Sequence, residues 1–197
     1  KKAIFPVNEN TIAPVSEPIV KSNDHVFTKN IKLVVVGIST GGPAAMPSVL
    51  HNMGVLPCPM VIAQHMPAVF THSFAEHMRR ETGLNVIEGE DGTQLEPGMI
   101  VIAPGGTDCV IREPFSGKFT LYHKRCESAV VHPNADVLFQ SAASLSVNVA
   151  ALVMTGMGND GTQGAKALAL KGMPILVQDP QSCVVDGMPG SIIACLL

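Results

Sequence analysis

Short runs of apolar residues recur along the chain from position 32 onward. They cover residues 32–38, 59–64, 98–104, 149–156 and 174–179, and most of them are apolar at consecutive positions. A strand has this pattern when helices cover both faces of its sheet. The apolar runs therefore predict buried, parallel strands.

Between these runs, apolar residues recur at intervals of three and four, which is typical of amphipathic helices. We expect helices over residues 43–53, 70–81, 135–146 and 161–171 and a last helix that begins near Pro189. The segment 109–123 differs, because two β-rich stretches flank "PFSG" and predict a hairpin. The expected fold is α/β: a doubly wound, mostly parallel sheet of about seven strands with helices on both faces and an antiparallel hairpin.

In the first 30 residues, the apolar positions follow neither the alternation of a strand nor the spacing of a helix. Pro6, Pro14 and Pro18 stand among polar residues there, and no lipidation or secretory pattern is visible. We expect residues 1–30 to be a linker or disordered tail. With 197 residues in all and 46% of them hydrophobic, the chain is long enough for residues 31–197 to form one globular domain.

The distribution of charge argues against two classes of partner. The 13 Lys and Arg residues are scattered, and the formal net charge is -3, so a nucleic acid has no basic surface to bind. No charged residue occurs from Leu33 to Ala75, but glycines and five prolines interrupt this stretch before an apolar span of about 18 residues forms. We therefore expect no nucleic-acid binding and no membrane insertion.

The cysteines indicate neither disulfides nor a metal site. There are five of them, an odd number, and none forms a C-x-x-C pair. This usage favours a reducing compartment, the cytoplasm, and we expect no metal or organic cofactor.

Three chemically distinct side chains follow three of the predicted strands. Ser39 comes after the first, His65 after the second in "VIAQHMP", and Asp160 after the fourth in "MTGMGNDGTQG". The carboxyl ends of parallel strands meet at one edge of a sheet, where functional groups gather. A serine becomes a nucleophile when an imidazole takes its proton, and a carboxylate orients that imidazole. The sequence thus predicts a serine, histidine and aspartate site.

Each of these motifs also has a simpler interpretation. "GISTG" matches the nucleophile pattern G-x-S-x-G, but it is equally a tight turn that needs glycine. The same turn could bind a phosphate at a helix N-terminus, although the Lys of a Walker motif is missing. Asp160 could cap the helix that follows it. The order Ser, His, Asp differs from that of α/β-hydrolases, which disfavours a lipase-like fold.

Taken together, these blocks resemble the catalytic domain of the chemotaxis receptor methylesterases (CheB-type protein-glutamate methylesterase). The similar stretches are "GISTGGP" (37–43), "VIAQHMP" (61–67), "EDGTQLEPGMIVIAPGG" (90–106), "ADVLFQSAA" (135–143), "TGMGNDGTQG" (155–164) and "QDPQSCVVDGMPGS" (178–191). They occur in the family's order and cover most of residues 31–197, which would then be the methylesterase catalytic domain.

The resemblance implies an enzyme that hydrolyses glutamyl methyl esters on the cytoplasmic helical bundle of methyl-accepting chemotaxis receptors and that also deamidates selected glutamines. Carried over by position, Ser39 is the nucleophile, His65 the general base and acid, and Asp160 the residue that orients the imidazole. The family also implies that the backbone N–H of Met157 faces the oxyanion. On general grounds we add the N–H of Thr40, the residue after the nucleophile.

The family's usual partner is an N-terminal receiver domain that blocks the site until it is phosphorylated, and the sequence contains no such domain. Residues 1–30 resemble the linker that would follow it. Two alternatives to the receptor methylesterase stay open. One is a serine esterase that acts on another protein or on a small ester, and the other is a non-catalytic domain of the same fold that binds receptors or phosphate.

Overall fold

The computed structural model describes residues 30–113, 118–127 and 129–196. In these ranges nine strands, five α-helices and a short 3-10 helix follow one another. Their bounds are β1 (Leu33–Ile38), α1 (Gly42–Met53), β2 (Met60–Gln64), α2 (Ala68–Thr82), β3 (Asn85–Glu88), β4 (Gln94–Leu95), β5 (Met99–Ile102), β6 (Asp108–Arg112), β7 (Phe119–Lys124), α3 (Ala135–Ala143), β8 (Val149–Val153), α4 (Thr162–Leu170), β9 (Ile175–Val177), η2 (Pro180–Ser182) and α5 (Gly187–Leu196).

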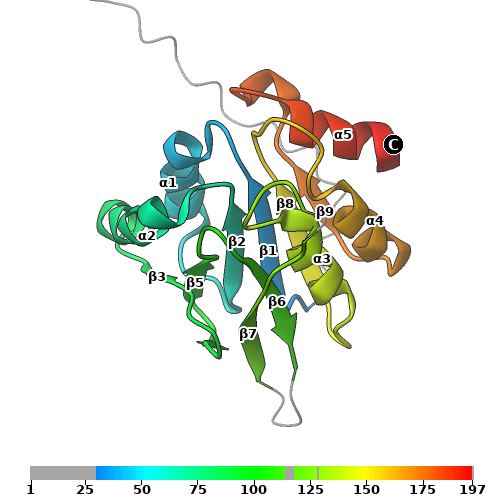
Figure 1. Cartoon of the computed structure of the whole chain (residues 1–197). Coiled ribbons are helices and arrows are strands. Elements are labelled where there is room, and N and C mark those ends of the chain that lie inside the picture. Colours follow the sequence, from blue (N-terminus) through cyan, green and yellow to red (C-terminus); the bar gives the residue numbers. More distant parts are fainter. Residues whose placement is uncertain (1–29, 114–117, 128, 197) are drawn as a thin grey trace, which may run out of the picture.

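The main sheet has six strands in the order β3-β5-β2-β1-β8-β9, and all of its pairs are parallel. The chain runs from β1 outward through β2 toward β3, and later returns to the other side of β1 with β8 and β9. Helices α1 and α2 lie on one side of this sheet and α3, α4 and α5 on the other (Figure 1). The predicted doubly wound α/β fold is confirmed.

Alternating side chains of the strands fill two separate cores. Val34, Val36 and Ile38 of β1 pack with α1 and α2, whereas Leu33 and Val35 pack with α3, α4 and α5. All six residues of β1 are buried, as a central strand with two covered faces requires. This is why the sequence shows a continuous apolar run there.

The predicted hairpin is also confirmed, but it does not join the main sheet. Strands β6 and β7 pair antiparallel, and β4 adds a third strand on the far side of β7. The expectation of about seven strands in one sheet is thus corrected to six parallel strands and a separate sheet of three. Both β3 and β4 were missed, because "NVIE" holds two apolar residues and "QL" one, so neither forms an apolar run.

Most of the predicted helix ends lie within two residues of those in the structure, and only the end of α3 differs by more. The helix expected over 135–146 ends at Ala143, and the last helix begins at Gly187, two residues before Pro189. The predicted tail, residues 1–30, lies outside the described residues apart from Asn30, and the hairpin turn at 114–117 lies outside them too.

A close contact between β1 and α3 brings the start of that helix to the functional edge of the sheet. Gly37, next to last in β1, has no side chain, and a Cβ there would lie 2.9 Å from the Cβ of Ala135, the first residue of α3. The missing side chain therefore lets the N-terminus of α3 reach the carboxyl end of β1.

Candidate active site

Ser39 and His65 follow neighbouring strands at the same level. Ile38 is paired with Gln64 in the register of β1 and β2, and the next backbone hydrogen bond runs from the His65 N–H to the Ile38 carbonyl at 3.0 Å. Ser39 is also tied to β8, since its N–H donates to the Thr155 carbonyl at 3.0 Å. The predicted serine and histidine therefore follow neighbouring strands, next to the point between β1 and β8 where the sheet's strand order reverses, which is the usual position of a ligand site in this fold.

His65 contacts Asp160 from the loop after β8. The distance from His65 Nε2 to Asp160 Oδ2 is 2.7 Å, and the two side chains are only 9% and 12% exposed. An ionised carboxylate can only accept hydrogen bonds, so Nε2 carries the proton of the neutral imidazole. The other ring nitrogen, Nδ1, then has the free lone pair that a general base needs.

Backbone N–H groups at the start of α3 bind the Asp160 carboxylate. Oδ2 accepts from Ala135 N at 2.6 Å, and Oδ1 accepts from Asp136 N at 2.9 Å. These are the unsatisfied donors at the start of α3, where an anion is favourable. The interpretation that Asp160 caps the helix after it is thus corrected: the N-cap of α4 is Gly161, with no side-chain cap, and Asp160 instead accepts from the first two N–H groups of α3.

These contacts decide the charge state of Asp160. Burial raises its pKa, but hydrogen bonds from His65 and from the two N–H groups of α3 outweigh burial, so the pKa lies below its ordinary value. The neighbouring Asp136 shows the opposite result, because burial and the charge of Asp160 raise its pKa against a hydrogen bond from Gly164. Of the two carboxyl groups, Asp160 is therefore the one whose pKa favours the ionised form.

The two predicted oxyanion donors, Thr40 and Met157, lie in the loops after β1 and β8. The Thr155 hydroxyl donates to the Thr40 carbonyl at 2.9 Å and accepts from Val185 N at 3.1 Å, which ties the two loops together. In the described part of the chain, neither Thr40 N–H nor Met157 N–H donates to another protein group. Both donors are therefore available to a ligand.

A second imidazole and carboxylate pair supports the loop in front of α3. His132 Nδ1 lies 2.9 Å from Asp108 Oδ1, and the fully buried Asp108 also accepts from Cys126 N and Asn134 N, both at 2.8 Å. Asn134 in turn accepts from Val137 N at 2.9 Å and caps α3. This network could not be predicted, since nothing near Asp108 in the sequence indicates a contact with His132.

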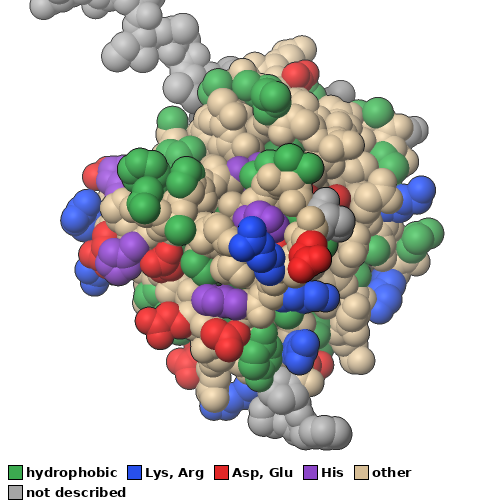
Figure 2. Space-filling model, viewed as in Figure 1, with side chains coloured by type: hydrophobic (Ala, Val, Ile, Leu, Met, Phe, Trp, Pro, Cys, Tyr) green, Lys and Arg blue, Asp and Glu red, His purple; other side chains and the backbone are tan. Residues whose placement is uncertain are grey.

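The surface around the site is more apolar than charged. Large apolar side chains in the segments that follow strand ends or precede α3 are exposed, namely Val69 (78%), Phe70 (55%), Val130 (96%), Met157 (74%) and Val184 (68%). Figure 2 shows hydrophobic side chains over the upper part of this face and most charged ones lower down or at its sides. This edge thus offers contacts to an apolar or weakly charged surface.

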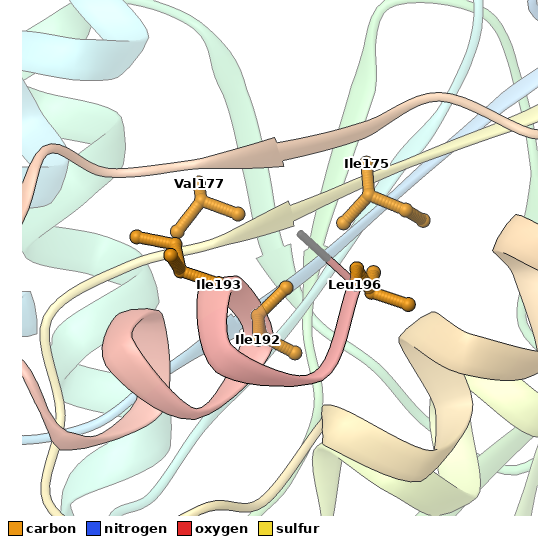
Figure 3. Close-up of a pocket in the computed structure, with 5 residues that line it drawn as sticks. All are labelled: Ile175, Val177, Ile192, Ile193 and Leu196. Atoms are coloured by element: carbon orange, nitrogen blue, oxygen red, sulfur yellow. The ribbon is translucent and has the colours of Figure 1, made fainter.

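Other features of the described residues offer no competing site. No group of three or more His, Cys, Asp or Glu residues in the described ranges could hold a metal ion. A groove between β9 and α5 is lined by Ile175, Val177, Ile192, Ile193 and Leu196 (Figure 3), so aliphatic side chains alone face it. None of the five helices as described has both the length and the apolar character to cross a bilayer.

A parallel α/β sheet with a serine, a histidine and an ionised aspartate at its switch point defines the class of protein as an α/β domain with a candidate serine hydrolase site. The sequence profile of the CheB methylesterase family matches residues 34–196. The chain therefore belongs to the CheB methylesterase family.

Curated relatives have the same family function in their names. A "Protein-glutamate methylesterase/protein-glutamine glutaminase 1" of Saccharophagus degradans is 41% identical over 164 residues, which are 82% of this chain and 44% of that protein. A second such protein, of Pseudomonas fluorescens, is 43% identical over 167 residues, 84% of this chain and 43% of that protein. The chain thus spans less than half the length of these relatives.

A solved structure extends the similarity to the fold. The crystal structure of the Thermotoga maritima CheB methylesterase catalytic domain matches with a TM-score of 0.79 and 36% identity, over 83% of this chain and 88% of that one.

Proposed function

We propose that this chain is the catalytic domain of a protein-glutamate methylesterase, and that Ser39, His65 and Asp160 carry out the hydrolysis. The observation that carries the proposal is the 2.7 Å contact between His65 Nε2 and an aspartate whose pKa is lowered, next to a serine on the neighbouring strand. The family membership and the names of the relatives support the choice of substrate: glutamyl methyl esters of chemoreceptor cytoplasmic bundles, with glutamine deamidation as a second reaction.

In the first half of the reaction, Ser39 Oγ attacks the ester carbonyl carbon while His65 Nδ1 takes the hydroxyl proton. The carbonyl oxygen becomes an oxyanion, to which the N–H groups of Thr40 and Met157 donate. The intermediate then collapses, the imidazolium gives its proton to the methoxy oxygen, and methanol leaves an acylated Ser39.

In the second half, water attacks the acyl carbon and gives a proton to His65 Nδ1. Collapse of this intermediate breaks the bond to Ser39 Oγ, which regains the proton, and free glutamate is the product. Asp160 stabilises the imidazolium in both halves and keeps the ring in one tautomer. Every proton moves between groups that the chain, the substrate and water supply, so the reaction requires no metal or organic cofactor.

The proposed substrate also implies where the enzyme acts and which partners it meets. The cytoplasmic bundle of a chemoreceptor meets the enzyme in the cytoplasm, and regulation in a two-component pathway would come from a receiver domain in a longer protein. The apolar surface formed by Val69, Phe70, Val130, Met157 and Val184 is then the part of this domain that faces the receptor.

The experiment that tests the proposal is methanol release from a methyl-esterified chemoreceptor fragment, with the parent chain compared to Ser39→Ala, His65→Ala and Asp160→Ala. We expect Ser39→Ala to lower kcat by roughly 10⁴-fold or more, with His65→Ala close behind. A fluorophosphonate probe should label Ser39 in the parent alone. Labelling without methanol release would mean a serine esterase with another substrate. If neither labelling nor methanol release occurs, a non-catalytic binding domain is favoured.

A further inference from the structure

A buried amide side chain connects the residue that carries the candidate nucleophile to the residue that carries the candidate base. Gln64 is the last residue of β2 and is only 1% exposed. Its Nε2 donates to the Ser39 carbonyl at 3.0 Å and to the His65 carbonyl at 3.1 Å. Because carbonyl oxygens accept and cannot donate, the NH₂ end of the amide is the only end that fits there.

The Gln64 amide binds just beyond the last backbone hydrogen bond between β1 and β2. The bond from His65 N to Ile38 O, at 3.0 Å, is the last one between β1 and β2, and beyond it the two strands turn toward different helices. Both Ser39 and His65 lie just past this point. The side chain of Gln64 therefore adds one further rung at the position where the strands would otherwise separate.

This arrangement is unfavourable for stability alone. Gln64 Oε1 is buried and has no hydrogen-bond partner among the described residues. It faces Gly42 at the start of α1, where an added Cβ would collide with it. A buried oxygen without a partner costs free energy that an apolar side chain of the same size would avoid. The unpaired Oε1 therefore offsets part of what the two hydrogen bonds from Nε2 contribute to stability.

We propose that Gln64 is a positioning residue, which holds the backbones of Ser39 and His65 together so that Ser39 Oγ can come within reach of His65 Nδ1. This inference rests on the proposed function, since it assigns a role within the same site. Gln64 itself touches no substrate, because its side chain is buried behind both residues. Its contribution is to kcat, because a shift of about 1 Å between reacting groups lowers the rate by as much as about 10²-fold.

The test compares Gln64→Met, which keeps the size and removes both donors, with Met78→Ala, a control that weakens the same core from α2. For both variants we would measure kcat and KM for methanol release, the rate of Ser39 labelling by a fluorophosphonate, and the melting temperature. We expect Gln64→Met to lower kcat and the labelling rate by roughly 10- to 100-fold and to leave KM within about twofold. Met78→Ala should lower the melting temperature without this loss of rate.

Two results would overturn the inference. One is a Gln64→Met enzyme with the parent's kcat and labelling rate, and the other is a loss of rate that Met78→Ala reproduces at equal melting temperature. Should the parent itself release no methanol and bind no probe, the proposed function fails. The role of Gln64 is then decided by the hydrogen exchange of its side-chain NH₂ group in ¹⁵N NMR spectra. Slow exchange supports the bridge between the two carbonyls, and rapid exchange refutes it.

Discussion

Replacing Asp160 by Asn changes the charge of the site with almost no change in shape. Each carboxylate oxygen accepts two hydrogen bonds: Oδ2 from His65 Nε2 and Ala135 N, and Oδ1 from Asp136 N and Gly161 N. An amide nitrogen in either position therefore faces groups that donate to the native carboxylate. No orientation of the Asn side chain satisfies all four.

The cost to stability follows from these contacts. A buried donor left without an acceptor costs about 1–3 kcal/mol, so we expect Asp160→Asn to lower the unfolding free energy by about 2 kcal/mol at pH 7. The difference depends on pH. Because the folded pKa of Asp160 is lowered, its stabilising effect is present above the unfolded value of about 3.9 and is lost as the pH falls through the folded pKa. Parent and variant should therefore converge in strong acid.

The loss of activity has a separate cause. If the amide nitrogen takes the place of Oδ2, His65 Nε2 has to accept a hydrogen bond, and the ring proton moves to Nδ1. A protonated Nδ1 cannot take the proton of Ser39. The corresponding change in serine proteases lowers kcat about 10⁴-fold, and we expect a loss of that order here.

Methanol release and urea unfolding at pH 7 and at low pH would measure both effects. Asp91→Asn is a matched control, since Asp91 is exposed, accepts from His123 N of β7, and is hydrogen-bonded to none of Ser39, His65 and Asp160 in the described residues. The reasoning would be refuted by an Asp160→Asn enzyme that keeps activity within about tenfold of the parent. It would equally be refuted by a stability difference that grows as the pH falls.

Three further changes test the surroundings of the site. A Cβ on Gly156 would collide with the side chain of Met188 and lie 2.7 Å from Ser39 Cβ, so Gly156→Ala should abolish fluorophosphonate labelling while circular dichroism still shows a folded chain. Asp108→Asn breaks the buried pair with His132 and should lower the unfolding free energy in urea by about 3 kcal/mol. Burial raises the pKa of Cys109 to about 12, and iodoacetamide at pH 8 should modify it only after unfolding, as mass spectrometry can show.

The sequence predicted best those features that depend on the residue pattern of a single helix or strand. A central strand such as β1 is buried on both faces, and its apolar run predicts it directly. The side chains at the ends of β1, β2 and β8 could be grouped because parallel topology brings carboxyl ends to one edge. The contact between His65 and Asp160 agrees with that prediction, while the catalytic roles of these residues remain predictions for the experiments above.

What the sequence could not predict depends on contacts between distant segments. A cap on the following helix was an alternative interpretation of Asp160, because capping is a local rule, whereas its partners are the first N–H groups of α3, 24 and 25 residues earlier. Gln64 looked like part of an ordinary strand, since only the end of the ladder with β1 gives its amide two carbonyls to bind. The strands β3 and β4 owe their existence to neighbours rather than to their own four and two residues.

The Asp160 carboxylate is therefore held mainly by α3, a helix that precedes β8 in the chain. Asp160 lies after β8, but α3 supplies two of its hydrogen bonds, and Asp136 of α3 accepts from Gly164 N of α4 at 2.7 Å. A Cβ on Gly164 would collide with Phe139 of α3, so these helices pack without a side chain between them. Because the Asp160 carboxylate is hydrogen-bonded to the first N–H groups of α3, a shift of α3 would move the carboxylate relative to His65. The packing of α3 against α4 therefore helps to fix the position of Asp160 beside the imidazole.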